Sequence, residues 1–166
     1  MFFFEGVEVI GKSCEVKAEI HWQDSIVQAQ VKVSIQVTSF DSGNSFRDGD
    51  IPEIFKAELT PNIRFISTWL SRTDMQKILE EQNAEVSGIL EVAGNTFPVK
   101  FTLNFTDQGG FFLIEGKLIT SFTDLKIEVP TAGLGGLLAD TRDYLELLVH
   151  LQSNKISGAE NIVLRN

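Results

Sequence analysis

Two histidines and one cysteine are the side chains in this chain best suited to metal binding or nucleophilic chemistry. His21 and His150 each fall within an alternating apolar pattern, and the sequence has no HExxH spacing, no second cysteine and no Cys/His cluster. Cys14 falls on the apolar face of its predicted strand, where a buried thiol is unreactive. We therefore expect structural roles for all three residues, no metal site, no catalytic residue, no enzymatic activity and no cofactor.

A polar segment, Asp41–Asp48, is the other place where side chains could do chemistry. Gly43 and Asn44 tolerate a positive φ, the two aspartates can accept hydrogen bonds from nearby amides, and Arg47 presents a fork that fits a carboxylate. A calcium loop of the EF-hand type needs glycine at its sixth position, where this segment has Phe46. We predict a structural polar turn rather than a catalytic or calcium loop. Its residues are Asp41, Gly43, Asn44, Arg47 and Asp48.

Charge and composition exclude several classes of partner. The 166 residues include 14 Lys and Arg against 23 Asp and Glu, a net charge of −9. Binding to nucleic acid or to an anionic membrane surface needs clustered basic residues, which are absent here. No stretch is long and apolar enough for a transmembrane segment. The 13 Phe, 2 Trp and single Tyr instead indicate an interior rich in rings without hydroxyl groups.

Alternation of apolar and polar residues dominates the chain and predicts half-buried β-strands. In Ser25–Phe40 the odd positions from Val27 to Val37 are apolar and the even positions are polar. The same pattern and its weaker variants predict about eight strands in all. The further segments are Cys14–Trp22, Phe97–Phe105 and Leu145–Leu151, and, less regularly, Phe2–Ile10, Asn62–Leu70, Ala84–Ala93 and Gly110–Ser121.

Turn and helix signals fall between these strands. Ala93–Thr96 and Asp107–Gly110 have the glycine and asparagine content of short hairpins, which makes the strand order antiparallel. Thr73–Gln76 predicts a capping box and Asp50–Glu53 a short helical turn with proline in its first turn. Gly133–Gly136 lacks the context of a phosphate-binding loop and predicts a flexible connection.

The length fits one domain, which we place at residues 1–153, followed by a weakly attached tail at 154–166. Long antiparallel strands with one apolar face form either a sandwich or a closed barrel, and closure removes the exposed edges. The first residues carry neither a basic region nor a long apolar region, so we expect a cytoplasmic protein as the sequence stands, or a periplasmic one if a leader has been removed.

Several segments together resemble the YceI-like family. Val31–Phe55 contains the pattern Asp-x-Gly-Asn-x-x-Arg-Asp directly after a long strand. Thr60–Thr68 is similar to the family's Pro-x-Ile-x-Phe-x-Ser strand, Val86–Gly94 to its Gly-x-Leu-x-x-x-Gly strand, and Ser121–Pro130 to its Asp-x-x-Ile-x-x-Pro segment. The resemblance covers nearly the whole chain, and the Asp-x-Gly-Asn-x-x-Arg-Asp block is its most specific part.

This resemblance implies an all-β, mainly antiparallel, eight-stranded lipocalin-like barrel with one or two short helices, whose interior takes up a long lipid chain. The expected partner is a long-chain isoprenoid, such as a polyisoprenoid or an isoprenoid quinone, or another lipid, carried or sequestered without catalysis. The alternative is a stress-associated or interaction module with a packed, ligand-free barrel. A homodimer through a strand edge or an apolar patch is compatible with the sequence, which does not locate it.

The predicted ligand-binding residues lie on the apolar faces of the strands, where a packed core and a ligand wall give the same alternation. The predicted barrel lining comprises Val33, Ile35, Ile63, Phe65, Trp69, Leu90, Val99, Phe101, Leu103, Phe112, Leu145 and Leu147.

Overall fold

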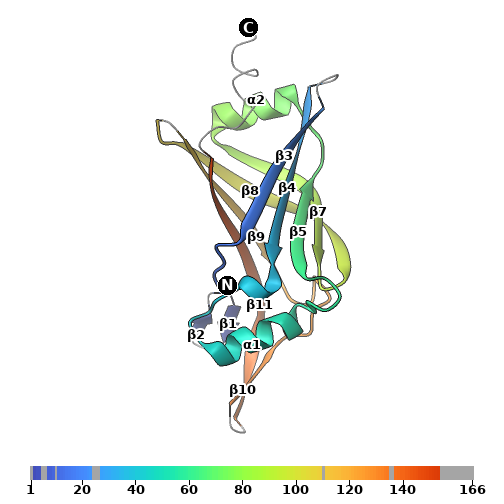
Figure 1. Ribbon diagram of the computed structural model, residues 1–166, viewed down its shortest axis with the longest axis vertical. Coiled ribbons are helices and arrows are strands. Elements are labelled where there is room, and N and C mark those ends of the chain that lie inside the picture. Colours follow the sequence, from blue (N-terminus) through green and yellow to red (C-terminus); the bar gives the residue numbers. More distant parts are fainter. Residues whose placement is uncertain are drawn as a thin grey trace.

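The computed structural model describes residues 2–4, 7–9, 11–23, 27–109, 111–134 and 137–153 of the chain. These residues form an elongated, strongly curled sheet with one helix at each end (Figure 1). None of the helices within these ranges has the length and apolar character needed to cross a membrane.

The sheet is antiparallel throughout, and its strands follow the order β2-β1-β11-β9-β8-β7-β5-β4-β3, with β10 paired to β11 and β6 to β4. The bounds are β1 Phe2–Phe4, β2 Val7–Val9, β3 Val16–Gln23, β4 Gln28–Gln36, β5 Asn62–Ser67, β6 Leu70–Ser71, β7 Asn83–Val92, β8 Asn95–Asp107, β9 Phe112–Thr120, β10 Thr131–Leu134 and β11 Leu137–Ser153.

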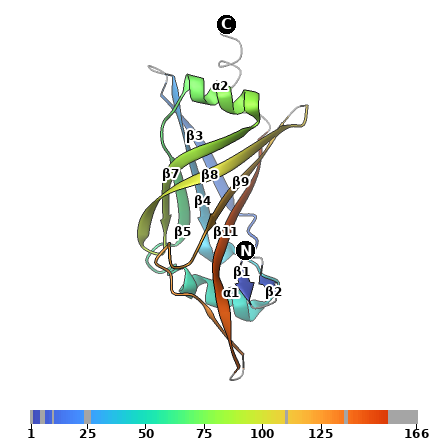
Figure 2. The same ribbon diagram turned by 180° about the vertical axis from the view of Figure 1, so that it is seen from behind.

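Seven of these strands, from β11 through β9, β8, β7, β5 and β4 to β3, form a curled half-barrel. Each neighbouring pair is antiparallel, so the first and last of the seven run in the same direction. Figure 2 shows β8, β9 and β11 forming the wall opposite β4 and β5. Among the described residues, no ladder joins β3 to β11.

The predicted antiparallel, lipocalin-like architecture with short helices is thus confirmed, although the half-barrel has seven strands where eight were predicted and several strand boundaries differ. The predicted strand Asn62–Leu70 contains β5 and the start of β6, and β11 begins at Leu137 rather than at Leu145. The segment Phe2–Ile10 contains two short strands that pair with each other rather than one. The segment Ser25–Phe40 contains β4 and then a 3-10 turn, η1, at Val37–Ser39. The glycine run predicted as a flexible connection begins inside β10, whose ladder with β11 includes Gly133; residues 135 and 136 lie outside the described residues.

Register places the apolar side chains of neighbouring strands in rows across the inner face. One such row runs through Ala18, Val33, Phe65, Leu90 and Phe97. Because side chains alternate between the two faces of a strand, the residues between them form rows on the outer face. The alternation read from the sequence therefore does separate the interior of the half-barrel from its exterior.

Helix α1, Ser45–Ile54, begins five residues earlier than the sequence signal at Asp50 suggested. Its N-cap is Asn44, whose side chain accepts hydrogen bonds from the backbone amides of Phe46 and Arg47. Pro52 therefore lies near the end of the helix rather than in its first turn. The expectation was wrong because the asparagine cap, a strong helix start, was interpreted as part of a turn.

Helix α2, Arg72–Glu81, is capped by Ser71 and Asp74, not by the predicted pair Thr73 and Gln76. The Ser71 hydroxyl accepts a hydrogen bond from the Asp74 amide, and the Asp74 carboxylate accepts one from the Ser71 amide. The Ser71 hydrogen bonds lower the pKa of Asp74 below its ordinary value. In this capping box, the aspartate at the third helical position has the role that glutamate or glutamine usually has.

The hydrophobic core is packed most densely against α1. Val37 of η1 and Ile51 and Phe55 of the α1 segment join Phe122 and Leu125 of the loop after β9, and all five are nearly inaccessible to solvent. Since α1 and α2 lie at opposite ends of the half-barrel (Figure 1), this packing fills one end of the interior.

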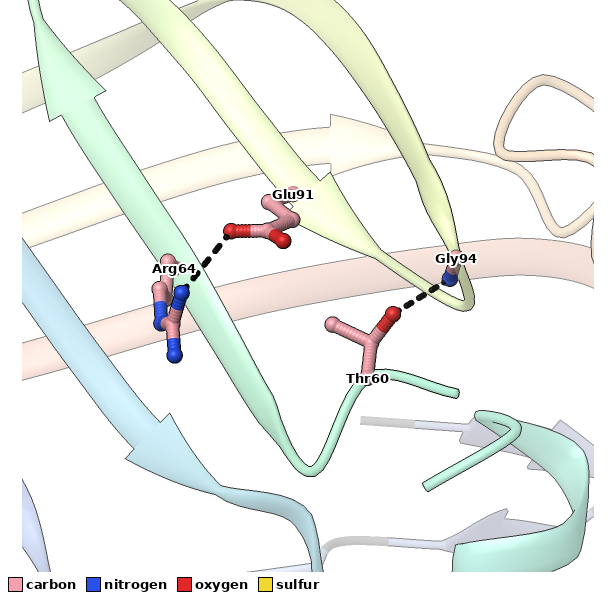
Figure 3. A network of polar contacts seen from close by, with 4 residues as sticks. All are labelled: Thr60, Arg64, Glu91 and Gly94. Carbon is pink, nitrogen blue, oxygen red and sulfur yellow. Dashed lines mark hydrogen bonds and ion pairs between the residues drawn. The ribbon is translucent and has the colours of Figure 1, made fainter. Parts of the chain in front are cut away.

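The hairpin between β7 and β8 is anchored to this packed end. Ala93 and Gly94 have φ values of 51° and 76°, as a two-residue type I′ turn requires. The Gly94 amide donates a 2.6 Å hydrogen bond to the hydroxyl of Thr60, a buried residue before β5 (Figure 3). The short hairpin predicted at Ala93–Thr96 is confirmed, and Asp107–Gly110 likewise connects β8 to β9, with Gly110 outside the described residues.

Candidate functional site

A cavity of about 980 Å³ occupies the half of the barrel that the core does not fill. Inward-facing residues of all seven strands of the half-barrel line it, and most are apolar. Its volume is at the upper end of the range of ~300–1,000 Å³ typical of small-molecule pockets. A cavity lined in this way takes up an apolar ligand by removing its surface from water.

Helix α2 covers one end of the cavity. Met75, Ile78 and Leu79 line it and recur at helical spacing on one face of α2. Met75 is buried and packs with Ala29 of β4 and Leu70 of β6. The packed core near α1 forms the other end, so the cavity lies between a helical cover and an apolar floor.

Eight of the twelve predicted lining residues do line this cavity, and they come from five strands. Val33 and Ile35 lie on β4 and Ile63 and Phe65 on β5. The other four are Leu90, Phe101, Leu103 and Leu147. The rings of Phe65 and Phe101 meet with their centroids 4.8 Å apart, at an interplanar angle of 59°. This contact brings the two largest of the eight side chains, one from β5 and one from β8, together inside the half-barrel.

The remaining four predicted residues do not line the cavity. Trp69 lies between β5 and β6 and is 45% exposed, because β5 ends at Ser67 and the alternation does not continue to it. Leu145 is fully buried within the packed core. Val99 also packs against that core, and Phe112 lies half-buried at the start of β9. The alternation identifies which residues face the interior, but it does not show which of them pack in the core and which line the cavity.

Several lining residues were not among the predicted ones. They include Val16, Ala18 and Ile20 of β3, Ala29 and Val31 of β4, and Val149 and Leu151 of β11. The same alternation that identified these strands marks their inward positions, so this signal was available in the sequence. The three α2 residues could have been found only by knowing that the helix folds over the cavity.

The polar side chains that reach the cavity offer no catalytic arrangement. Cys14 lies next to the cavity but is exposed and precedes β3, contrary to the expectation of a buried thiol on a strand. The other polar residues of the lining are Lys12, Ser13, Glu146, His150 and Gln152. Within the described part of the chain, no three His, Cys, Asp or Glu residues gather into a metal-binding group.

Both histidines contact the carboxylate of a neighbouring glutamate. The His21 Nε2 atom lies 3.1 Å from a carboxylate oxygen of Glu19, two residues earlier on β3. The His150 Nδ1 atom lies 3.4 Å from Glu115 on the adjacent strand β9. In both pairs the side chains are largely exposed.

The polar segment after η1 holds the start of α1. The Asp48 carboxylate accepts hydrogen bonds from the Ser42 amide and hydroxyl, at 2.7 and 2.6 Å, and these bonds lower the pKa of Asp48. The Gly43 amide donates to Asp41, and Arg47 donates from Nη2 to the Ser42 carbonyl at 3.4 Å. All of these hydrogen bonds are local, and the segment is not among the residues lining the cavity.

A second polar group lies on β11 and β9. Glu146 is only 8% exposed, and its carboxylate contacts the Lys117 Nζ atom at 2.7 Å and accepts a hydrogen bond from the Tyr144 hydroxyl at 2.9 Å. The contact with Lys117 is the main cause that lowers the pKa of Glu146, and the same contact raises the pKa of Lys117. A nearly buried carboxylate that is among the residues lining the cavity is thereby kept charged.

The fold and this site define a class of protein: an antiparallel, lipocalin-like half-barrel with an internal apolar cavity and a helical cover. The chain belongs to the YceI-like family, whose domain model matches residues 2–151. No curated protein has a matching sequence.

Solved structures with the same fold include members of this family. A YceI protein from Campylobacter jejuni superposes with a TM-score of 0.68 at 16% identity, covering 90% of this chain and 86% of that one. BcnA from Burkholderia cenocepacia gives 0.63 at 17% identity, with 84% of each chain covered. A polyisoprenoid-binding domain from Saccharophagus degradans gives 0.56 at 13% identity, covering 76% of this chain and 82% of that one.

Proposed function

We propose that this protein binds a long isoprenoid lipid, such as a polyprenol or an isoprenoid quinone, inside the half-barrel and carries or sequesters it without catalysis. The observation that supports the proposal is the apolar cavity of about 980 Å³ between the packed core and α2. The family and the polyisoprenoid-binding domain with the same fold support the same class of ligand.

Apolar burial alone supplies the affinity that such binding needs. Burying one methylene group contributes about 0.8 kcal/mol, which corresponds to roughly a fourfold change in the dissociation constant. A ligand chain therefore gains affinity with each isoprene unit that enters the cavity, until the cavity is filled. Specificity comes from length and shape rather than from hydrogen bonds, since few polar side chains reach the lining.

The charges around the cavity favour a neutral head group over a pyrophosphate. Arg64 forms an ion pair with Glu91 on the outer face, and neither Arg64 nor Lys126 belongs to the cavity lining (Figure 3). Lys12 is one positive charge at the lining of a protein whose net charge is −9. A pyrophosphate would lose more hydration than one lysine restores. We therefore expect tighter binding of farnesol than of farnesyl pyrophosphate.

The first experiment is extraction of the purified protein with organic solvent, followed by mass spectrometry of the extract. A stoichiometric isoprenoid would support the proposal and identify its chain length. If the extract holds none, delipidated protein is titrated with farnesol and with a short-chain quinone. Failure to take up either ligand would overturn the proposal and favour the packed-barrel alternative, in which the protein acts through its outer surface.

A further inference from the structure

Strand β3 forms one end of the sheet, and its outer edge has no ladder within the described residues. Lys17, Ala18, Glu19 and His21 are exposed, and Ile20 is 39% exposed although it faces the cavity. An exposed strand edge presents a row of unpaired backbone amides and carbonyls to any strand of matching length. The edge of β3 spans eight residues and contains no proline.

The opposite end of the half-barrel is not in the orientation to pair with this edge as an antiparallel partner. β3 and β11 run in the same direction because six antiparallel steps separate them. A strand that pairs with the edge of β3 in the antiparallel manner of this sheet must run in the direction opposite to β3. A second copy of β3 related by a two-fold axis has that direction.

The charges of β3 select one register for such a pairing. A two-fold axis perpendicular to the sheet places inward side chains opposite inward ones. This is possible only when one residue of β3 directly faces the same residue of the second copy. The axis then lies midway between these two copies, and we call it an axis through that residue. An axis through Lys17 would oppose two lysines, and an axis through Glu19 would oppose two glutamates. An axis through Ala18 instead places Lys17 opposite Glu19 of the partner subunit, and by symmetry Glu19 opposite Lys17 of the partner subunit.

The neighbouring residues agree with the Ala18 axis. Glu15, just before β3, would face His21 of the partner subunit, again with opposite charges when the histidine is protonated. On the inner face Val16 would face Ile20 of the partner subunit, which joins two apolar side chains. An axis through Ile20 would give only Glu19 opposite His21 of the partner subunit, with Lys17 opposite an uncharged glutamine. The Ala18 register therefore has the larger number of complementary pairs.

We propose that β3 pairs with β3 of a second copy of this chain, antiparallel and centred on Ala18. The pairing extends the wall of the cavity beyond Val16, Ala18 and Ile20, which the single chain leaves partly open to solvent along this edge. It concerns assembly and does not depend on the identity of the ligand. A single pair of edge strands is a small interface, so we expect an association of micromolar strength rather than an obligate dimer.

Charge reversal tests the register in solution. Sedimentation equilibrium of delipidated protein between about 5 and 500 µM should show reversible dimerisation of the 18.5 kDa chain. Lys17→Glu and Glu19→Lys should each weaken dimerisation by about tenfold or more, because each creates two like-charged opposite pairs. The double variant, Lys17→Glu with Glu19→Lys, should restore it. Lys100→Glu, on β8, is the control and should not affect dimerisation. A monomer at all concentrations, or a double variant no better than the single ones, would overturn the proposal.

Cysteine cross-linking tests the two-fold axis directly. In a Cys14→Ser background, Ala18→Cys should form an intermolecular disulfide on mild oxidation, because directly opposed residues of antiparallel strands have α-carbons about 4.5–5.5 Å apart, within the range that disulfides span. Ile20→Cys should cross-link poorly, because residue 20 faces Val16 of the partner subunit in this register. Efficient cross-linking through Ile20→Cys with none through Ala18→Cys would place the axis elsewhere and refute the proposed register.

Discussion

The ring of Phe65 lies directly against Gly88 on the neighbouring strand. A β-carbon built on Gly88 would fall 2.5 Å from the Phe65 Cε2 atom and 2.4 Å from the carbonyl oxygen of Ile66. Phe65 can occupy this position, in contact with Phe101, only because residue 88 has no side chain. One wall of the cavity thus depends on a glycine within a strand, where glycine often marks a close approach of this kind.

Gly88→Ala is expected to lower the free energy of unfolding by about 1–3 kcal/mol, the usual cost of overpacking a core. The backbone carbonyl of Ile66 cannot move aside as a side chain could, and the Phe65 ring must shift. Urea unfolding of both proteins measures the difference. Gly49→Ala is the matched control: nothing lies within 4 Å of its new β-carbon in α1, so it should stabilise by about 0.5–1 kcal/mol. Equal midpoints for Gly88→Ala and wild type would show that the wall adapts.

A substitution that narrows the cavity should abolish ligand uptake without unfolding the protein. Val31 lines the cavity from β4 and is only half-buried, so a phenylalanine there can extend into empty space. We expect Val31→Phe to weaken farnesol binding by about tenfold or more, because the added ring occupies space in which several methylene groups of the ligand would be buried. Fluorescence titration of a competing apolar dye measures the loss.

The control for this experiment is Ile66→Phe, which adds the same ring to the outer face of β5, where Ile66 is 37% exposed. It should bind farnesol as the wild type does. Equal affinity of Val31→Phe and wild type would mean that the ligand does not occupy this part of the half-barrel.

Much of the fold can be predicted from local patterns in the sequence. The alternation in β8, where Phe97, Val99, Phe101 and Leu103 face inward, is the same in the sequence and in the structure. Each strand can be recognised from the alternation of apolar and polar residues within its own segment. The hairpin at Ala93 and Gly94 is equally local.

The candidate site is less predictable because it depends on how far packing extends along each strand. Leu145 and Leu147 have the same pattern and neighbouring positions, yet Leu145 is fully buried in the core and Leu147 lines the cavity. The difference arises from the segment after β9, whose Phe122 and Leu125 fill one end of the barrel. No local pattern reports a contact between segments so distant in the chain.

Arg47→Ala should destabilise the protein and leave ligand binding intact. The Arg47 side chain donates to the Ser42 carbonyl and helps to hold the polar turn before α1, away from the cavity. Loss of one such hydrogen bond costs about 0.5–1.5 kcal/mol, which lowers the melting temperature by several degrees. Thermal unfolding followed by circular dichroism measures it.

Lys77→Ala is a suitable comparison for Arg47→Ala, because Lys77 forms only an exposed 3.9 Å ion pair with Glu81 and should change the melting temperature little. If Arg47→Ala melted as the wild type does but no longer bound farnesol, the turn would have to act on ligand entry instead of on stability.

The last prediction concerns the Glu146 carboxylate and the pH dependence of stability. Lys117 lowers the folded-state pKa of Glu146 below its ordinary value of 4.5. Because the folded pKa is the lower one, this contribution is fully present above about pH 4.5 and is lost as the pH falls through the folded pKa. Lys117→Met keeps most of the length of the side chain but removes its charge, and leaves a nearly buried carboxylate without its main partner. We therefore expect Lys117→Met to be less stable than the wild type at pH 7, with the difference shrinking below pH 4.5 as Glu146 becomes protonated.

Urea midpoints between pH 3 and 8 measure this difference, and Lys100→Met provides the comparison, because its ion pair with Glu85 is exposed on both sides. Lys100→Met should show a small difference at every pH, since surface ion pairs contribute little. The alkaline side gives a second check. The folded pKa of Lys117 lies above its ordinary value of 10.5, so the contribution of the pair should persist up to that pH and decline only as the pH rises through the folded value. A Lys117→Met deficit that stayed constant from pH 8 to pH 3 would mean that the lysine acts through its packing rather than through its charge.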